Sequence, residues 1–237
     1  MNDTELKQLA DEFARANKRR LAAELTDLSK YAPDITPISV FMAGSPGAGK
    51  TEYSKNLVQS LEEKQKNQVI RIDPDDFRKL LPGYDGKNSS VFHFAANLIT
   101  EAVHDSALRQ KQNFLLDGTF SNYEKARFNI ARSLDQGRPV FISYVYQKPE
   151  TAWQFTIARE KEDGRTIPRD AFIRQFLGAR ETIDKIRKEY ADHVTIFLIQ
   201  KDLETKIAEP FKITQAGPQI DHYIKEQYTQ NDLEKLL

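Results

Sequence analysis

The feature that most constrains the fold is a glycine-rich octapeptide between an apolar strand and a helical stretch. Residues 44–51 read Gly-Ser-Pro-Gly-Ala-Gly-Lys-Thr and match the G-x-x-x-x-G-K-[ST] pattern in full. The short apolar segment 38–42 precedes it, and a helical stretch follows to about residue 64. Glycines let successive backbone N–H groups turn inward toward phosphate oxygens, and the helix start adds partial positive charge. The pattern predicts a phosphate-binding loop, or P-loop, in an α/β fold.

Strand and helix patterns alternate along the rest of the chain. Further apolar runs typical of strands lie at 68–72, 113–116, 139–145 and 194–199. The stretches with helical spacing between them are 90–110, 123–135, 150–162 and 169–190. This order predicts a P-loop NTPase fold of the kinase type, an α/β fold with a five-stranded parallel sheet and helices on both faces.

Both ends of the chain extend beyond this alternation. Residues 2–31 are expected to form one amphipathic helix, with Asn2 and Glu5 at capping-box spacing and Pro33 beyond its end. Its apolar stripe comprises Leu6, Leu9, Phe13, Ala16, Leu21, Leu25 and Leu28. We predict an N-terminal helical extension at 1–36, a kinase domain at 37–202 and a C-terminal extension at 203–237 packed on that domain. The C-terminal extension contains one helical stretch, 221–237.

Composition excludes several classes of protein. The 35 basic and 35 acidic residues give a formal net charge of zero, which argues against a nucleic-acid-binding protein. The absence of cysteine excludes disulfides, thiolate metal sites and cysteine nucleophiles. No apolar run is long enough to span a bilayer, and the N-terminus lacks the pattern of a signal peptide. The expectation is a soluble cytoplasmic protein that binds neither nucleic acid nor membrane.

The P-loop predicts the nucleotide and metal ligands. Lys50 is expected to reach the β- and γ-phosphates of ATP, and Thr51 to bind Mg²⁺. The residues expected to bind the nucleotide are Gly44, Ser45, Pro46, Gly47, Ala48, Gly49, Lys50 and Thr51. A GTPase is disfavoured, because the chain has neither the D-x-x-G segment nor the N-K-x-D guanine-binding motif.

Two acidic clusters follow predicted strands, where ligands bind in open α/β sheets. Asp73 and Asp75 follow the strand at 68–72, and Asp117 follows the strand at 113–116. Such carboxylates hold Mg²⁺ or accept the proton of an attacking hydroxyl. Asp73 or Asp75 is equally suited to cap a helix, so one aspartate can cap while the other has a functional role.

An arginine-rich turn joins the helical stretches 150–162 and 169–190. Arg159 and Arg165 are the best candidates to neutralise a transferring phosphoryl group from a lid at about 150–190, and Arg169 and Arg174 are weaker ones. The alternative is a solvated charged turn.

Asn97 and Glu101 lie one helical turn apart, which places both on one face as candidate substrate ligands. The four histidines have no metal-ligand spacing.

Together these residues resemble the zeta toxin family of P-loop kinases over roughly 38–200. The resemblance rests on the P-loop, on Ile72-Asp73-Pro74-Asp75, on the 97–101 stretch, on Asp117-Gly118-Thr119, and on Arg159 with Arg165. It implies an enzyme that uses ATP and Mg²⁺ to phosphorylate the 3′-hydroxyl of UDP-N-acetylglucosamine, which depletes a peptidoglycan precursor. It also implies restraint by an antitoxin.

The resemblance also implies a role for each matching residue. Asp75 would be the general base, Lys50 and Thr51 would hold ATP and Mg²⁺, and Arg159 and Arg165 would clamp the phosphates. The implied substrate ligands are Asp73, Asn97, Glu101, Asp117 and Thr119, with Asp117 also a candidate metal ligand.

Two substrate-side positions depart from the family pattern. Asp117 stands where the family commonly has glutamate, and Phe120-Ser121-Asn122 lacks the arginine expected after Thr119. Other readings therefore stay open: a kinase of another acceptor, such as a nucleotide or an antibiotic, or a nucleotide-binding ATPase module that works through partner contacts. The helix at 2–31 is a candidate cis-acting inhibitor, or it simply packs on the fold.

Overall fold

The computed structural model describes residues 1–65, 68–164, 166–201, 208–213 and 220–237. The chain folds into two compact units, and each unit is built from segments that are distant in sequence. The first unit comprises Met1–Pro37, Lys55–Leu116 and Ile157–Thr166. The second unit comprises Ile38–Ser54, Asp117–Thr156 and Ile167–Leu237. Helices α2 (Lys50–Gln65) and α6 (Pro149–Asp163) contribute residues to both units.

The first unit combines a parallel strand pair with three helices. Strand β2 (Val69–Ile72) pairs with β3 (Asn113–Leu116), with Val69 opposite Asn113. The helices are α1 (Asp3–Leu25), α3 (Pro74–Arg78) and α4 (His93–Arg109). Buried side chains of β3 and α4 form its core, among them Phe114, Ile99 and Val103.

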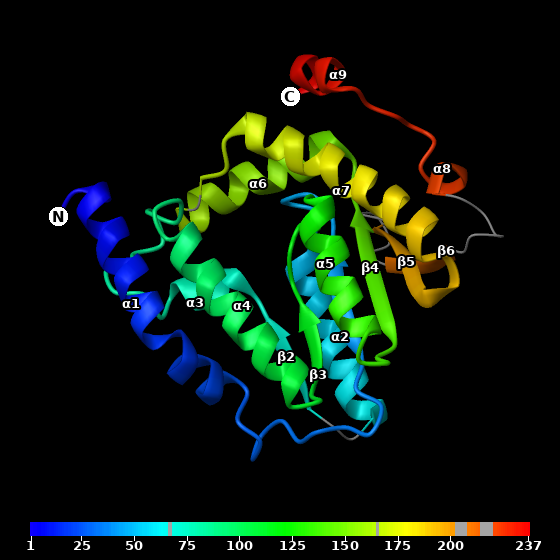
Figure 1. The fold of residues 1–237 in the computed structure, drawn as a ribbon. Helices are drawn as coiled ribbons and strands as arrows, with labels where there is room; N and C mark the ends of the chain where they lie inside the picture. Colours follow the sequence, from blue (N-terminus) through cyan, green and yellow to red (C-terminus); the bar gives the residue numbers. More distant parts are fainter. Residues whose placement is uncertain (66–67, 165, 202–207, 214–219) are drawn as a thin grey trace. The chain divides into compact units, whose positions relative to one another are not determined.

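Helix α1 lies along α4 (Figure 1). The predicted capping box is confirmed: Asn2 accepts from the Glu5 N–H, and the Glu5 carboxylate accepts from the Asn2 N–H. The helix ends at Leu25 rather than near residue 31, and Leu28 is 52% exposed. It ends there because the buried Thr26 hydroxyl bonds to Ala22 and to Ser106 of α4, which fixes the chain as it leaves the helix.

The second unit contains four paired strands. Strands β1 (Ser39–Ala43), β4 (Val140–Tyr146) and β5 (Val194–Lys201) pair in parallel, with Ser39 opposite Val140 and Val140 opposite Val194. Strand β6 (Ala208–Ile213) pairs antiparallel with β5. The sequence analysis predicted five strands and missed β6. The described residues therefore contain six strands, and all the pairings within the two units except β5–β6 are parallel.

Helices pack on these strands within the second unit. Helix α5 (Tyr123–Leu134) contacts β4, and α7 (Arg169–Tyr190) contacts β5; a single 3-10 turn, η1 (Ala191–His193), leads from α7 into β5. The aromatic rings of Trp153 and Phe172 lie 5.1 Å apart between α6 and α7. No helix of the described residues is long and apolar enough to cross a membrane.

The C-terminal segment differs from the single helix predicted at 221–237. It forms two short helices, α8 (Ile220–Tyr223) and α9 (Gln230–Leu236), separated by an extended stretch. The interruption follows from the Thr229–Asp232 capping box, which starts a new helix at residue 230. Helix α9 packs on α7 through the buried Leu233, and Arg169 donates to the Glu234 carbonyl.

Candidate active site

The P-loop occupies the connection between β1 and α2, as the sequence predicts. Gly44, Gly47 and Gly49 adopt φ angles of 136°, 71° and 86°, which other residues rarely adopt. A Cβ atom on Gly47 would lie 1.9 Å from the Ala152 carbonyl oxygen of α6. One on Gly44 would lie 2.3 Å from the Val145 carbonyl oxygen of β4. The loop therefore needs glycine for both its conformation and its packing.

Lys50 lies against this loop. Its Nζ donates to the carbonyl oxygens of Gly44 at 2.8 Å and Ser45 at 2.6 Å. Thr51 follows in the first turn of α2 and is half-buried. The arrangement fits a nucleotide phosphate, because the ammonium group, the glycine-rich backbone and a helix N-terminus converge there.

Asp117 belongs to the same unit as the P-loop and is held next to α2. It is 6% exposed, and its Oδ2 accepts a 2.7 Å hydrogen bond from the fully buried Ser54 hydroxyl. The Ser54 Oγ also lies 3.0 Å from the Thr51 carbonyl oxygen. One hydroxyl thus joins the first turn of α2 to the carboxylate. Ser54 was not predicted as a site residue, although its position three residues after Thr51 puts it one turn further along α2.

The turn that follows Asp117 is tied to the P-loop a second time. The Gly44 N–H donates to the Thr119 carbonyl oxygen at 3.1 Å. The Thr119 and Ser121 hydroxyl oxygens lie 2.9 Å apart. The Phe120 backbone has a φ angle of 59°, and the centroid of its ring lies 6.3 Å from that of the Phe41 ring. The second unit thus brings together the predicted residues Lys50, Thr51, Asp117 and Thr119.

The Thr51 and Asp117 oxygens also fit Mg²⁺. This ion prefers oxygen ligands, and beside a nucleotide it takes only one or two from the protein, with phosphates and waters completing the octahedron. The described residues include no group of three or more histidine or acidic side chains that could hold a metal ion. A hydroxyl and one carboxylate beside the P-loop are consistent with a metal bound together with its nucleotide.

The acidic cluster after β2 lies in the first unit and divides into capping and exposed groups. Asp73 caps α3: one oxygen accepts from the Asp75 N–H at 2.9 Å, and the other accepts from Arg71. The capping interpretation is therefore confirmed for Asp73 and does not hold for Asp75, whose functional role stays a prediction. The Asp75 side chain is 34% exposed and pairs with the guanidinium of Arg78, whose own side chain is 8% exposed.

Asp76 forms ion pairs with Arg71 and Lys79 in this cluster. Burial raises the pKa of Asp76, but hydrogen bonds and charges from Lys79 and Arg71 outweigh it and leave that pKa below its ordinary value. Desolvation lowers the pKa of Arg78, against the raising charges of Tyr84 and Asp73. The cluster is thus a network of ion pairs in which Asp75 keeps partial solvent exposure.

Asn97 and Glu101 lie on α4 as predicted, and both are half-buried. The Asn97 amide contacts the exposed His93 ring, with 3.1 Å between Nδ2 and Nε2. Their spacing puts both side chains on one face of the helix. Whether they bind substrate stays a prediction.

The lid arginines differ in their surroundings. Arg159 is exposed on α6, and Arg165 lies outside the described residues. Arg169 bonds to the C-terminal segment, and Arg174 pairs with Asp170 on the exposed face of α7. Arg169 and Arg174 therefore have local partners, and the role of all four arginines in a lid stays a prediction.

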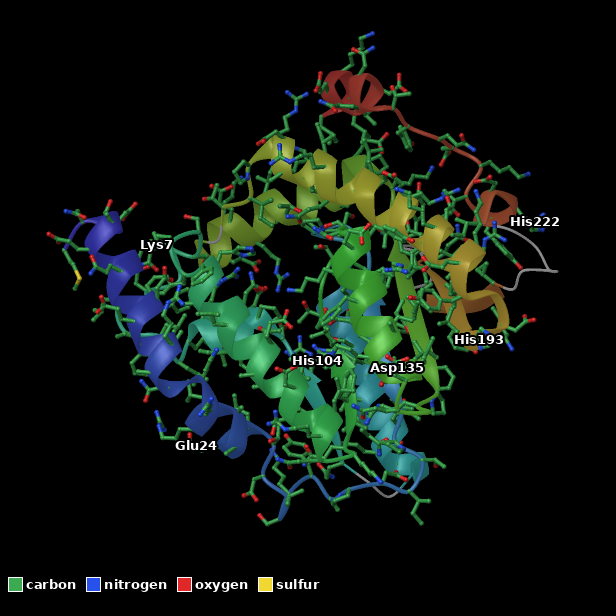
Figure 2. All side chains as sticks on the ribbon, viewed as in Figure 1. Lys7, Glu24, His104, Asp135, His193 and His222 are labelled. Carbon is green, nitrogen blue, oxygen red and sulfur yellow. The ribbon has the colours of Figure 1, made fainter. Side chains whose placement is uncertain are left out.

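The four histidines differ in burial: one is packed in a core, and three are exposed. His104 is buried in the first unit, 4.8 Å from the Phe114 ring (Figure 2). His193 and His222 lie in the second unit, and both are exposed. None of the four belongs to a metal-binding group within the described ranges.

Comparison with protein families now identifies the chain. The model of the Zeta toxin family matches residues 22–209. The chain belongs to the Zeta toxin family. This confirms the resemblance, and with it the α/β fold of P-loop kinase type. Among curated proteins, none matches the chain significantly.

Solved structures agree on the fold of this zeta toxin family member. The PezAT chromosomal toxin-antitoxin system of Streptococcus pneumoniae contains a chain with 17% identity and a TM-score of 0.71, with 98% of this chain and 94% of that one covered. The AvrRxo1-ORF1:AvrRxo1-ORF2 complex with ATP contains a chain with 15% identity and a TM-score of 0.59, with 93% and 71% covered. At these identities the similarity concerns the fold alone.

Proposed function

We propose that this zeta toxin family member is an ATP-dependent kinase that phosphorylates a sugar-nucleotide hydroxyl. The proposed acceptor is the 3′-hydroxyl of UDP-N-acetylglucosamine, and the proposed effect is a block in peptidoglycan precursor synthesis in the cytoplasm. One observation carries the proposal: Lys50, Thr51 and the Asp117 turn are assembled around a P-loop whose glycines pack against β4 and α6. That arrangement binds a nucleoside triphosphate for phosphoryl transfer rather than merely filling a core.

The proposed reaction is an in-line transfer. The acceptor oxygen forms a bond to the γ-phosphorus as the bond to the ADP oxygen breaks, and the hydroxyl proton passes to the Asp75 carboxylate. Lys50 holds the phosphates, and Arg159 and Arg165 neutralise the charge that develops on the transferring group. Mg²⁺, when bound through Thr51 and Asp117, supplies further charge neutralisation. Asp73, Asn97, Glu101 and Thr119 are the proposed acceptor ligands.

A protein partner is part of the proposal. The similar chains come from a toxin-antitoxin system and from a two-protein complex, which supports restraint by an antitoxin. The alternative, inhibition in cis by α1, has less support, since the buried side of α1 packs on α4. No nucleic acid is expected as a partner, given the zero net charge.

Mass spectrometry of a reaction with purified protein, Mg-ATP and UDP-N-acetylglucosamine tests this function. The expected product is the sugar nucleotide carrying one added phosphate. Lys50→Ala should nearly abolish it, because the proposed role of the Lys50 ammonium group is to hold the β- and γ-phosphates of ATP. Asp75→Ala should slow transfer by about 10²–10⁴-fold, the usual contribution of a general base.

The other outcomes separate the alternatives. ADP formation without a phosphorylated sugar nucleotide would reject this acceptor and direct the search to other hydroxyl compounds. ATP turnover that Asp75→Ala leaves intact would favour the ATPase module. Full activity of Lys50→Ala, verified as folded by circular dichroism, would contradict the P-loop mechanism.

A further inference from the structure

Ser54 and Asp117 form a buried polar pair that the P-loop pattern does not require. Ser54 is fully buried in α2, and Asp117 is 6% exposed at the end of β3. The two are 63 positions apart in sequence, yet their oxygens are 2.7 Å apart. A hydrogen bond from a hydroxyl to a buried carboxylate is charge-assisted, so it fixes the carboxylate more firmly than a neutral bond would.

The position of this hydrogen bond determines where the Asp117 carboxylate lies. The Ser54 hydroxyl reaches both Asp117 Oδ2 and the Thr51 carbonyl, so the carboxylate is held beside the helical turn that starts with Lys50 and Thr51. Aspartate is one methylene shorter than glutamate, which shortens its reach away from its own backbone. The backbone is fixed as well, because the Gly44 N–H holds the Thr119 carbonyl.

We infer that Ser54 is a positioning residue that holds the Asp117 carboxylate on the metal-nucleotide side of the P-loop. Asp117 then serves the metal that accompanies the nucleotide rather than the acceptor. This inference rests on the proposed nucleotide-binding function and deepens it. Side chains that orient a metal ligand typically change metal affinity by about 10–100-fold when they are removed.

Metal affinity measured apart from catalysis tests the inference. The probe is Mn²⁺ in the presence of saturating ADP, and the concentration of free Mn²⁺ is measured by electron paramagnetic resonance. Ser54→Ala should weaken Mn²⁺ binding by about tenfold, and Asp117→Asn by at least as much. The affinity for ADP in EDTA should change less than twofold in both variants. Because Ser54 acts through Asp117, the double variant should bind Mn²⁺ no more weakly than Asp117→Asn alone.

A matched control removes the general effect of losing a buried hydroxyl. Ser133 of α5 is also fully buried in a helix of the same unit, and its hydroxyl bonds to the Asn129 carbonyl of its own helix. Ser133→Ala should leave Mn²⁺ affinity unchanged, while its thermal midpoint reports the ordinary cost of such a deletion.

Three results would overturn the inference. Unchanged Mn²⁺ affinity in Ser54→Ala would leave Ser54 a packing residue, and unchanged affinity in Asp117→Asn would remove Asp117 from the metal. Additive losses in the double variant would mean that Ser54 acts by another route. Failure of the wild-type protein to bind ADP would instead refute the proposed function, and binding of ADP without any acceptor leaves this test fully usable.

Discussion

At the residue scale, the P-loop requires glycine at one position that the motif leaves unspecified. Gly47 has φ 71°, and an added Cβ would lie 1.9 Å from the Ala152 carbonyl and 2.7 Å from the Thr156 hydroxyl. The obstacle is the backbone of α6, which cannot turn aside like a flexible side chain. The position that reads only as "x" in the G-x-x-x-x-G-K-[ST] pattern is therefore fixed by packing.

Gly47→Ala should destabilise the fold and weaken ATP binding together. The matched control is Gly137→Ala, because Gly137 has a similar φ of 67° but no atom within 4 Å of an added Cβ. The control should lose about 1–2 kcal/mol, the usual cost of left-handed backbone, and retain ATP binding. Urea unfolding and calorimetric titration with ATP measure both effects. Equal losses in the two variants would contradict the packing argument.

At the element scale, α1 was predicted in type and in its start, but its end was wrong and its buried face was predicted only in part, through Leu6 and Leu21. The capping box fixed the start because it is a local signal. The stripe expected from apolar spacing included Leu9, Ala16 and Leu28, which are exposed, whereas Ala10 and Ala14 are fully buried. Alanines allow two helices to approach closely, and hydrophobicity alone does not reveal that the partner is α4.

Two leucines in and beyond this helix give a matched test. Leu21 is 6% exposed within α1, and Leu28 is 52% exposed after it. Leu21→Ala should cost about 2–5 kcal/mol of unfolding free energy, as for a large-to-small core substitution. Leu28→Ala should stay within about 0.5 kcal/mol of the wild type. Chemical unfolding followed by circular dichroism measures both effects. If α1 were only loosely attached, both variants would have the unfolding free energy of the wild type. Increased kinase activity in Leu21→Ala would favour inhibition in cis.

At the scale of the whole molecule, the sequence predicted the α/β class and the place of the P-loop between β1 and α2, because both depend on local patterns. Strand β6 was missed because a six-residue strand containing a proline and two charged residues lacks a clear alternation. Ser54 was missed because its role depends on Asp117, and no local spacing reports a contact across 63 positions. Tertiary contacts of this kind decide which of two chemically possible roles a carboxylate takes.

Stability of the whole fold in alkali should depend on two tyrosines of β4. Burial raises the pKa of both Tyr144 and Tyr146 above the ordinary 10, Tyr144 against the lowering charge of Arg180 and Tyr146 with support from Tyr228 and Glu226. Because the pKa of each tyrosine is higher in the folded state than in the unfolded chain, its contribution to the free energy of unfolding is fully present below pH 10. This contribution is lost as the pH rises above 10, where the tyrosines of the unfolded chain ionise first. The loss reaches about 1.4 kcal/mol per pH unit for each tyrosine.

Tyr146→Phe tests this dependence with little disturbance at neutral pH. The Tyr146 hydroxyl is buried and has no hydrogen-bond partner within the described part of the chain, so removing it should leave stability at pH 8 equal or higher. Between pH 10 and 11.5 the variant should lose stability less steeply than the wild type, and the double variant with Tyr144→Phe less steeply still. Urea midpoints measured across this range provide the comparison. Parallel curves for all three proteins would show that other groups control unfolding in alkali, since only the tyrosine hydroxyls differ among them.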